Sequence, residues 1–398
     1  MAPHPKKNIL FLEYQLILQD VVEVLQNRGH RLHGMHPRSI TVKHFIQTCR
    51  KHQIDWVFAI NFSPEIAFLC GKIGIPYVSW TIDPLSLNRY RIIDETIHEL
   101  CVCFAHDIET VQKFRDLGFP AQHMLLAAPD LRRQPISQKD LKSKYLCDAS
   151  FVGGSMINEV VELEDYLNSL EKDLIVTGKK TKREVLKWIK TMTLQHVTDP
   201  KYHGLKSLGG WSFVPKELQD LEISERQRQD ILFHIDGSLA ALHRQQAIYS
   251  LRKSSFELRV WGDKHWSKIH PNYQHRAEHN QELTHIYCAS GINIDIPRLY
   301  QRNTINMRVF DVLAAGGFVL TEKSDALQNV FTEGQHVGLY TSQKELEDKL
   351  QWWLHHPKER QQIAKQGREE VLQKHLISHR VDSILQYVEE TFFQNEHT

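Results

Sequence analysis

The chain has 398 residues, of which 41% are hydrophobic, so it can bury the cores of two domains. Its 49 Lys and Arg residues nearly equal its 48 Asp and Glu residues, which gives a formal net charge of +1. That balance excludes the strongly basic surface typical of proteins that bind nucleic acids or anionic membranes. We therefore expect the partner to be a small molecule or another protein.

The N-terminal segment and the cysteines indicate in which cellular compartment we expect the protein, namely the cytoplasm. The first apolar run is short, is interrupted by Glu13 and Gln15, and lacks a small-residue cleavage site, so we expect no signal peptide. No stretch of about 18 apolar residues predicts a membrane span. The cysteines lie mostly in or beside apolar runs and form no CxxC pair, which favours buried, reduced thiols and a cytoplasmic location.

The first 135 residues alternate short apolar runs with amphipathic segments. This alternation is typical of βα units that build a parallel sheet. The predicted strands are residues 8–13, 30–35, 55–62, 76–83, 99–107 and 123–130. We expect an N-terminal Rossmann-like domain over residues 1–135, with helices between most of these strands.

A second α/β pattern follows a polar linker at residues 136–148. Its predicted strands are residues 149–155, 256–263, 284–294, 317–323 and 336–340. Between the first two of these strands lies a polar helical insert at about 156–250. The C-terminal Rossmann-like domain is expected to span residues 149–375. Amphipathic spacing after Gln343 predicts helices up to the end, with 376–398 as the last helix.

Polar residues end three of the predicted N-terminal strands. In an open parallel sheet ligands bind beyond the carboxyl ends of the strands, so Asn61, Asp83 and Asp107 are candidates. Asp83 precedes Pro84, and it either stands near the ligand as a general base or caps and hydrogen-bonds its own loop. Asp107 is better explained as the cap of the helix that follows it, while His106 is a second candidate for the base.

The first strand of the second domain ends at a Gly-Gly pair, in the sequence SFVGGSMINE. Gly153 and Gly154 could present backbone amides to a phosphate ahead of a helix, because helix N-termini attract anions. The segment lacks the full GxGxxG pattern, however. A tight turn is the simpler explanation of the same two residues.

The segment NMRVFDVLAAGGFVLTEKS, residues 306–324, carries most of the expected chemistry. Arg308 and Asp311 are three residues apart on a predicted helix and hence on one face. The arginine can bind a diphosphate and the carboxylate can accept ribose hydroxyls, while Gly316 and Gly317 let the backbone approach the ligand. An exposed ion pair followed by an ordinary helix end also accounts for this spacing.

The sequence lacks the motifs that define several other enzyme classes. There is no DxD pair of carboxylates, so we expect no bound divalent metal and no metal cofactor. There is also no GxSxG, Walker A or HExxH motif, which argues against serine hydrolases, P-loop enzymes and zinc proteases.

Several segments in order resemble the C-terminal domain of the CgeB-like, spore-maturation-type glycosyltransferases. They are CASGINIDIP, RVFDVLAAGGFVLTEKSDALQNVF, EGQHVGLYTSQKELEDKL and HHPKERQQIAKQGREEVLQKHLISHR, all within residues 284–380. The run from DWVFAINF through GKIGIPYVSWTIDPL and CVCFAHDIETVQKFRDLGF to MLLAAPDLRR is similar to the N-terminal domain of the same group.

This resemblance implies the GT-B fold, in which two Rossmann-like parallel-sheet domains face each other across a cleft. The acceptor would bind the N-terminal domain and the nucleotide-sugar the C-terminal one, and the last helices would brace the two. Arg308 and Asp311 take the positions of the family's arginine and glutamate on the donor-binding helix, although Asp311 is one methylene shorter than the usual glutamate. Gly316, Gly317 and Thr321 would lie against the donor.

The expected activity is metal-independent transfer of a sugar from a nucleotide-sugar to a glycan, protein or small-molecule acceptor. An inverting reaction would use a base such as Asp83, whereas a retaining one requires no protein base. Two alternatives stay open: a catalytically inactive GT-B-like binding or assembly protein of a surface layer, and a sugar-nucleotide epimerase. The insert at 156–250 has little recognisable similarity to this family, so the family does not identify the acceptor.

Overall fold

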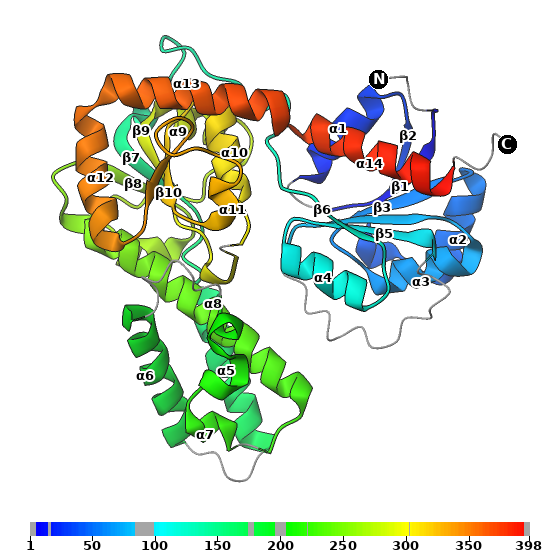
Figure 1. Ribbon diagram of the computed structural model, residues 1–398, viewed down its shortest axis with the longest axis horizontal. Coiled ribbons are helices and arrows are strands. Elements are labelled where there is room, and N and C mark those ends of the chain that lie inside the picture. Colours follow the sequence, from blue (N-terminus) through cyan, green and yellow to red (C-terminus); the bar gives the residue numbers. More distant parts are fainter. Residues whose placement is uncertain are drawn as a thin grey trace. The chain divides into compact units, whose positions relative to one another are not determined.

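The computed structural model describes residues 5–14, 17–83, 99–173, 179–195, 204–220, 222–301 and 303–393. The chain divides into two compact α/β units (Figure 1). The first unit is Met1–Leu131 together with Val371–Thr398, and the second is Arg132–Glu370. Each unit is built around one parallel sheet.

The first unit contains a six-stranded parallel sheet with the order β2-β1-β3-β4-β5-β6. Its strands are β1 (Asn8–Leu12), β2 (Arg31–Met35), β3 (Trp56–Ile60), β4 (Tyr77–Thr81), β5 (Cys101–Ala105) and β6 (Ala121–His123). Every residue of β3, β4 and β5 is buried, as expected for central strands of a parallel sheet that is covered on both faces.

Helices cover both faces of this first sheet. Figure 1 shows α1 (Leu18–Asn27) and α14 (Ile377–Phe392) on one face, and α2 (Val42–Lys51), α3 (Pro64–Ile73) and α4 (Ile108–Asp116) on the other. Arg28 on α1 donates two hydrogen bonds of 2.8 Å to the carboxylate of Asp382 on α14. This bidentate pair fixes the last helix to the first unit, although 239 residues of the second unit precede it in the chain.

The second unit contains a five-stranded parallel sheet with the order β11-β10-β9-β7-β8. Its strands are β7 (Cys147–Val152), β8 (Leu258–Trp261), β9 (Ser290–Asp295), β10 (Val319–Glu322) and β11 (Gly338–Tyr340). Around this sheet lie α9 (Gln281–Ala289), α10 (Met307–Ala314), α11 (Asp325–Gln328), α12 (Gln343–His355) and α13 (Pro357–Lys374). Phe151, Ile292 and Leu320 lie in its hydrophobic core and are 0% exposed.

The predicted helical insert is confirmed. Between β7 and β8 the chain forms α5 (Ile157–Asp173), α6 (Lys179–Gln195), α7 (Lys216–Gln219) and α8 (Glu225–Ser250). These helices share a hydrophobic core of their own, which includes Leu163, Ile189 and Ile235. Ser224 begins α8 with a reciprocal capping box, in which its hydroxyl accepts from the Gln227 N–H and its own N–H donates to the Gln227 side chain.

Two strand predictions are wrong in their bounds. In the predicted strand 284–294 the residues before Ser290 continue α9, because Leu283, Ile286 and Tyr287 are buried at helical spacing. In the predicted strand 123–130 only the first residue belongs to a strand. The Ala128 backbone instead bonds to the start of α14, accepting from the Ile377 N–H and donating to the His375 carbonyl at 2.9 Å each.

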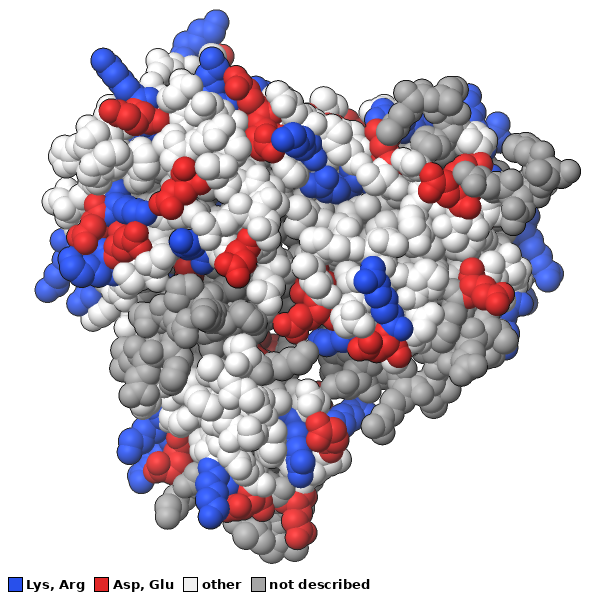
Figure 2. Space-filling view, in the orientation of Figure 1, with Lys and Arg blue, Asp and Glu red and all other residues white. Residues whose placement is uncertain are grey.

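The two sheets confirm the predicted fold class of two Rossmann-like domains with a helical insert and C-terminal helices. On the face seen in Figure 2, basic and acidic side chains are interspersed, in keeping with the balanced composition. Of the helices in the described ranges, none combines the length and the apolar character that crossing a membrane requires.

Arg133 fixes the start of the second unit to its helices. The side chain is fully buried, and its Nε lies 3.1 Å from Oδ2 of Asp311 on α10. Its Nη1 donates to the Asn280 carbonyl at 2.8 Å, and its Nη2 donates to the His279 carbonyl at 2.7 Å. A charge held away from water is tolerated only while its counter-ion and hydrogen bonds are in place.

Replacing Asp311 by Asn should destabilise the second unit by about 3–5 kcal/mol, because the Arg133 charge would stay buried without its partner. The matched control is Asp348→Asn, which removes a pair with Lys344 whose side chains are 84% and 64% exposed. That change should cost less than about 1 kcal/mol. Urea unfolding followed by tryptophan fluorescence measures both, and equal losses would contradict the structural role of the pair.

Candidate functional site

Both sheets reverse their strand order at one point. In the first sheet β1 lies between β2 and β3, and in the second β7 lies between β8 and β9. Crossover helices leave opposite faces at such a point, so a crevice opens beyond the carboxyl ends of the two central strands. The crevice between β7 and β9 is bordered by Gly153 and Gly154 after β7 and by Asp295 at the end of β9.

Asp295 is the polar centre of this crevice. Its side chain is 1% exposed and forms an ion pair with Nη1 of Arg308. The Asn306 amide donates to both carboxylate oxygens at 2.9 Å, and the Thr321 hydroxyl donates at 2.8 Å. Asn306 also caps α10 by accepting from the Arg308 N–H at 2.9 Å. The buried carboxylate therefore fixes both the first turn of α10 and the direction of the Arg308 side chain.

Arg308 and Arg244 bring two guanidinium groups to the same edge. A Cβ at Gly153 would lie 2.8 Å from Nη2 of Arg308, so a side chain at Gly153 would displace the arginine. The guanidinium carbons of Arg308 and Arg244 lie 5.4 and 5.9 Å from the centre of the Phe151 ring. Two cations beside one aromatic ring make this crevice suited to an anionic ligand.

Arg244 is buried and retains an unused hydrogen-bond donor. Its Nη1 donates to the Gly154 carbonyl at 3.1 Å and its Nη2 to the Ile296 carbonyl at 2.8 Å. Its Nε has no hydrogen-bond partner among the described residues. Burial, followed by repulsion from Arg308, lowers the pKa of Arg244 to about 9. An anion bound here would offset both effects.

The Gly-Gly loop is anchored more by the protein than the sequence suggests. The Gly153 N–H donates to the Trp261 carbonyl at 2.9 Å, and the Ser155 N–H donates to the Asp263 carboxylate. The Gly153 carbonyl accepts from the Trp266 indole at 2.8 Å. Of the loop's three amides, only that of Gly154 has no bond to the described part of the chain.

Thr321 shares this edge through its bond to Asp295, whereas Asp311, Gly316 and Gly317 do not. Asp311 is 2% exposed and pairs with Arg133, so the exposed ion pair between Arg308 and Asp311 that was the alternative interpretation does not form. Because α10 runs back along the sheet, Gly316 and Gly317 lie at the amino end of β10. Gly316 follows the helix with φ +80°, and a Cβ at Gly317 would lie 2.6 Å from the Tyr287 carbonyl, so packing explains both glycines.

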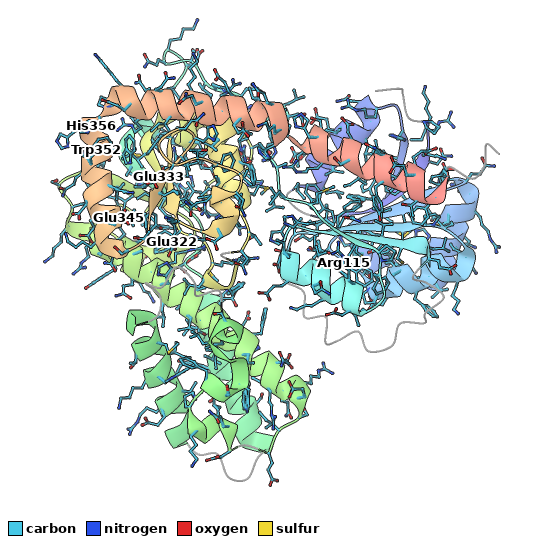
Figure 3. The ribbon with its side chains drawn as sticks, viewed as in Figure 1. Arg115, Glu322, Glu333, Glu345, Trp352 and His356 are labelled. Carbon is cyan, nitrogen blue, oxygen red and sulfur yellow. The ribbon has the colours of Figure 1, made fainter. Side chains whose placement is uncertain are left out.

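Glu322 and His243 are polar residues of the crevice that the sequence did not reveal. Glu322 ends β10 toward α8 (Figure 3), and its Oε2 lies 3.1 Å from Nε2 of His243 on that helix. The side chain of Glu322 is 6% exposed and that of His243 is 14% exposed. Asp295, Thr321 and Glu322 line the same small recess, so two carboxylates border it.

In the first unit the carboxyl edge gathers Tyr14, Asn61 and Asp83. These residues follow β1, β3 and β4. The Asp83 carboxylate accepts from the Tyr14 hydroxyl and from the Asn61 amide at 2.9 Å. Asn61 has φ +64°, a left-handed conformation that costs an Asn residue of the order of 1 kcal/mol, and its Oδ1 accepts from the Asp83 N–H at 3.1 Å. This bonding holds Asp83 in one orientation at the topological switch point.

His106 and Asp107 follow β5 at the same edge. His106 is 4% exposed and its Nδ1 lies 3.2 Å from the Thr81 carbonyl. Burial lowers the pKa of His106, so the imidazole is neutral near pH 7. Asp107 caps α4, accepting from the Glu109 N–H at 3.0 Å, as the sequence predicted.

Asp295 carried a partial signal in the sequence, because it is an acidic residue in an apolar run and lies two positions before Pro297, whereas Asp83 directly precedes Pro84. The predicted strand 284–294 stopped one residue short of it. Arg244 and His243 carried no comparable signal, since both lie in the polar insert. Within the described ranges no group of three or more His, Cys, Asp or Glu side chains is arranged to hold a metal ion.

Comparison with protein families gives one match. Residues 243–386 match the family described as glycosyl transferase-like, which is less than half of the chain. The match includes His243, Arg244, Asp295 and Arg308, and thus most of the polar residues of the second crevice. A search of curated proteins finds no match.

Solved structures similar to this chain include a sucrose-phosphate synthase from Thermosynechococcus elongatus, at 9% identity and a TM-score of 0.57, covering 97% of this chain and 100% of that one. A glycosyltransferase from Rickettsia africae ESF-5 is similar at 10% identity and a TM-score of 0.54, covering 98% and 100%. HepE from Anabaena in complex with UDP-glucose is similar at 11% identity and a TM-score of 0.51, covering 97% of this chain and 100% of HepE. The chain therefore has the GT-B fold, and the segment that holds most of the second crevice is glycosyltransferase-like.

Proposed function

We propose that this protein is a metal-independent glycosyltransferase of the CgeB-like group, which moves a sugar from a nucleotide-sugar to an acceptor hydroxyl. The observation that carries the proposal is the Arg308 guanidinium, which the buried Asp295 carboxylate holds beside Gly153 at the switch point of the second sheet. The diphosphate of the donor would bind there, at the position that the topology favours for ligands.

Charge supports a diphosphate at this position. When the bond between the sugar and the diphosphate breaks, the leaving group gains negative charge that the site must stabilise. Arg308 and Arg244 supply fixed positive charge for that purpose, in the role that a divalent cation has in metal-dependent transferases. Uridine diphosphate is the first ligand to test, because the similarly folded HepE binds UDP-glucose.

Glu322 is the better candidate for the hydroxyl groups of the donor. Asp311 was expected to accept the ribose hydroxyls, but its Oδ2 already pairs with Arg133. Glu322 ends β10 at the same edge as Arg308, its Oε2 lies 3.1 Å from Nε2 of His243, and its side chain lines the recess that Asp295 and Thr321 also line. We therefore assign the ribose or sugar hydroxyls to Glu322, with Thr321 holding Asp295 rather than the donor.

Asp83 is the proposed base if the reaction inverts the configuration of the sugar. The acceptor oxygen would form a bond to the anomeric carbon while the bond to the diphosphate breaks, and the hydroxyl proton would pass to the Asp83 carboxylate. Tyr14 and Asn61 position this carboxylate. His106 is less suited to the role, because its ring is buried and directed at the Thr81 carbonyl.

UDP at millimolar concentration should raise the melting temperature of the wild-type protein by roughly 5 °C, because binding to the folded state stabilises it. Arg308→Ala should weaken UDP binding about 100-fold, since it removes a charge-assisted contact. Arg276→Ala, which changes an exposed arginine outside the crevice, is the matched control. EDTA, which removes divalent metal ions, should leave the UDP-induced rise in melting temperature unchanged. If neither UDP nor GDP, ADP or dTDP stabilises the protein, the donor site is not here.

Asp83→Asn should reduce kcat about 100-fold or more while the KM for the donor stays near its wild-type value, because the change removes a base without touching donor contacts. Asp116→Asn, an exposed change on α4, serves as the control. The product anomer is determined in the same assay. An inverted product formed by Asp83→Asn at the wild-type rate would exclude Asp83 as the base.

His106 should make the protein less stable in mild acid. Because burial lowers its pKa in the folded state, the unfolded chain binds more protons once the pH falls through the ordinary value of 6.5. The free energy of unfolding should therefore decrease from pH 7 to 5, and the decrease should be smaller in His106→Gln. Urea titrations at several pH values measure this difference. An identical pH dependence in the two proteins would show that His106 is not held neutral by the fold.

A further inference from the structure

A second cavity lies at the opposite edge of the second sheet from the proposed donor site. It has a volume of about 650 Å³ and is bordered by Ser290 and Gly291 at the start of β9 and by Gly317 and Phe318 before β10. The proposed donor site is at the carboxyl ends of the same strands, and β9 has six residues, so roughly 20 Å of strand separates the two.

One face of α13 supplies the charge of this cavity. Arg360 and Arg368 are eight residues apart, two helical turns, and Lys365 lies one turn after Gln361 on the adjoining stripe. No Asp or Glu is among the residues that line the cavity. Burial lowers the pKa of Arg360, and the nearby Asp148, which is not among the lining residues, opposes that shift. The three cations share one wall of the cavity, and an anion between them would lower their mutual repulsion.

The three cations differ in how many of their hydrogen-bond donors are engaged by other protein groups. Arg368 donates from Nε to the Ala314 carbonyl at 3.1 Å, and Arg360 donates from Nη1 to the Trp353 carbonyl at 2.6 Å. Each guanidinium has five N–H donors, so both keep donors for a ligand. Lys365 is exposed and makes no ion pair or hydrogen bond with the described residues. It is the charge most open to an incoming anion.

The rest of the cavity wall is mostly apolar. Leu141, Leu146, Ala289 and Phe318 contribute carbon surface, and Leu146 is 49% exposed although it is a large aliphatic residue. A ligand that fits this wall has an apolar body as well as a negative charge, because the body would cover carbon surface that water now contacts.

We infer that this cavity is a binding site for a small organic anion, such as a phosphate ester with an apolar body, and that it is separate from the nucleotide-sugar site. The inference does not depend on the proposed transferase activity. It rests on the cavity, on the three cations that α13 contributes to its wall and on the apolar wall beside them.

The test uses naphthyl phosphate as probe, titrated into the full chain by calorimetry, with naphthol and inorganic phosphate as the two halves of the probe. Naphthyl phosphate should bind one site more tightly than either half. Lys365→Glu should weaken the binding about tenfold, because it replaces an attractive charge by a repulsive one. Lys358→Glu, an exposed change on the same helix outside the cavity, should leave the affinity unchanged.

Arg308→Ala separates the two sites, because it should leave naphthyl phosphate binding unchanged. The inference is overturned if naphthyl phosphate does not bind saturably, if naphthol binds equally well, or if Lys365→Glu and Lys358→Glu have the same effect. It is also overturned if Arg308→Ala abolishes the binding, which would place the probe at the donor site.

Discussion

The second unit depends on one buried carboxylate, that of Asp295. Its negative charge at the end of β9 is compensated by Arg308, by the Asn306 amide and by the Thr321 hydroxyl. These contacts begin α10, join β9 to β10 and direct a cation into the crevice at the switch point. A buried charge is stable only with such compensation, so the same bonds that hold the strand ends together also fix the geometry of the proposed phosphate contact.

Two charged residues of α10, three positions apart, have different roles. Its first turn presents Arg308 to the crevice, whereas Asp311, one turn later, is buried against Arg133. The two residues are on neighbouring positions of the helix surface, yet each has a partner from a different part of the chain. The charge of one serves the crevice, and the charge of the other fixes the start of the second unit to α9 and α10.

The sequence predicted the fold, because strand periodicity indicated both parallel sheets. The rule that ligands bind beyond strand ends made Asp83 and Gly153 candidates, and their roles stay predictions. Arg308 was predicted as a phosphate ligand, and this role stays a proposal.

The sequence could not predict which residues distant in the chain would contact one another. The burial of Asp311 depends on Arg133, 178 positions earlier, and the contact of Glu322 depends on His243 in an insert without a recognisable pattern. The glycine pair at 316–317 was expected near the donor, but only the direction of α10 shows that it lies at the other edge.

We propose that Asp295 orients Arg308 to bind a nucleoside diphosphate, and a double-mutant cycle distinguishes this role from a direct contact of Asp295 with the ligand. The affinity of the tightest-binding nucleoside diphosphate is measured by calorimetry for the wild type, Asp295→Asn, Arg308→Ala and the double variant. We expect each single change to weaken binding, and the double variant to bind no more weakly than Arg308→Ala alone, because Asp295 acts through the arginine. Losses that add in the double variant, or an affinity unchanged by Arg308→Ala, would contradict it.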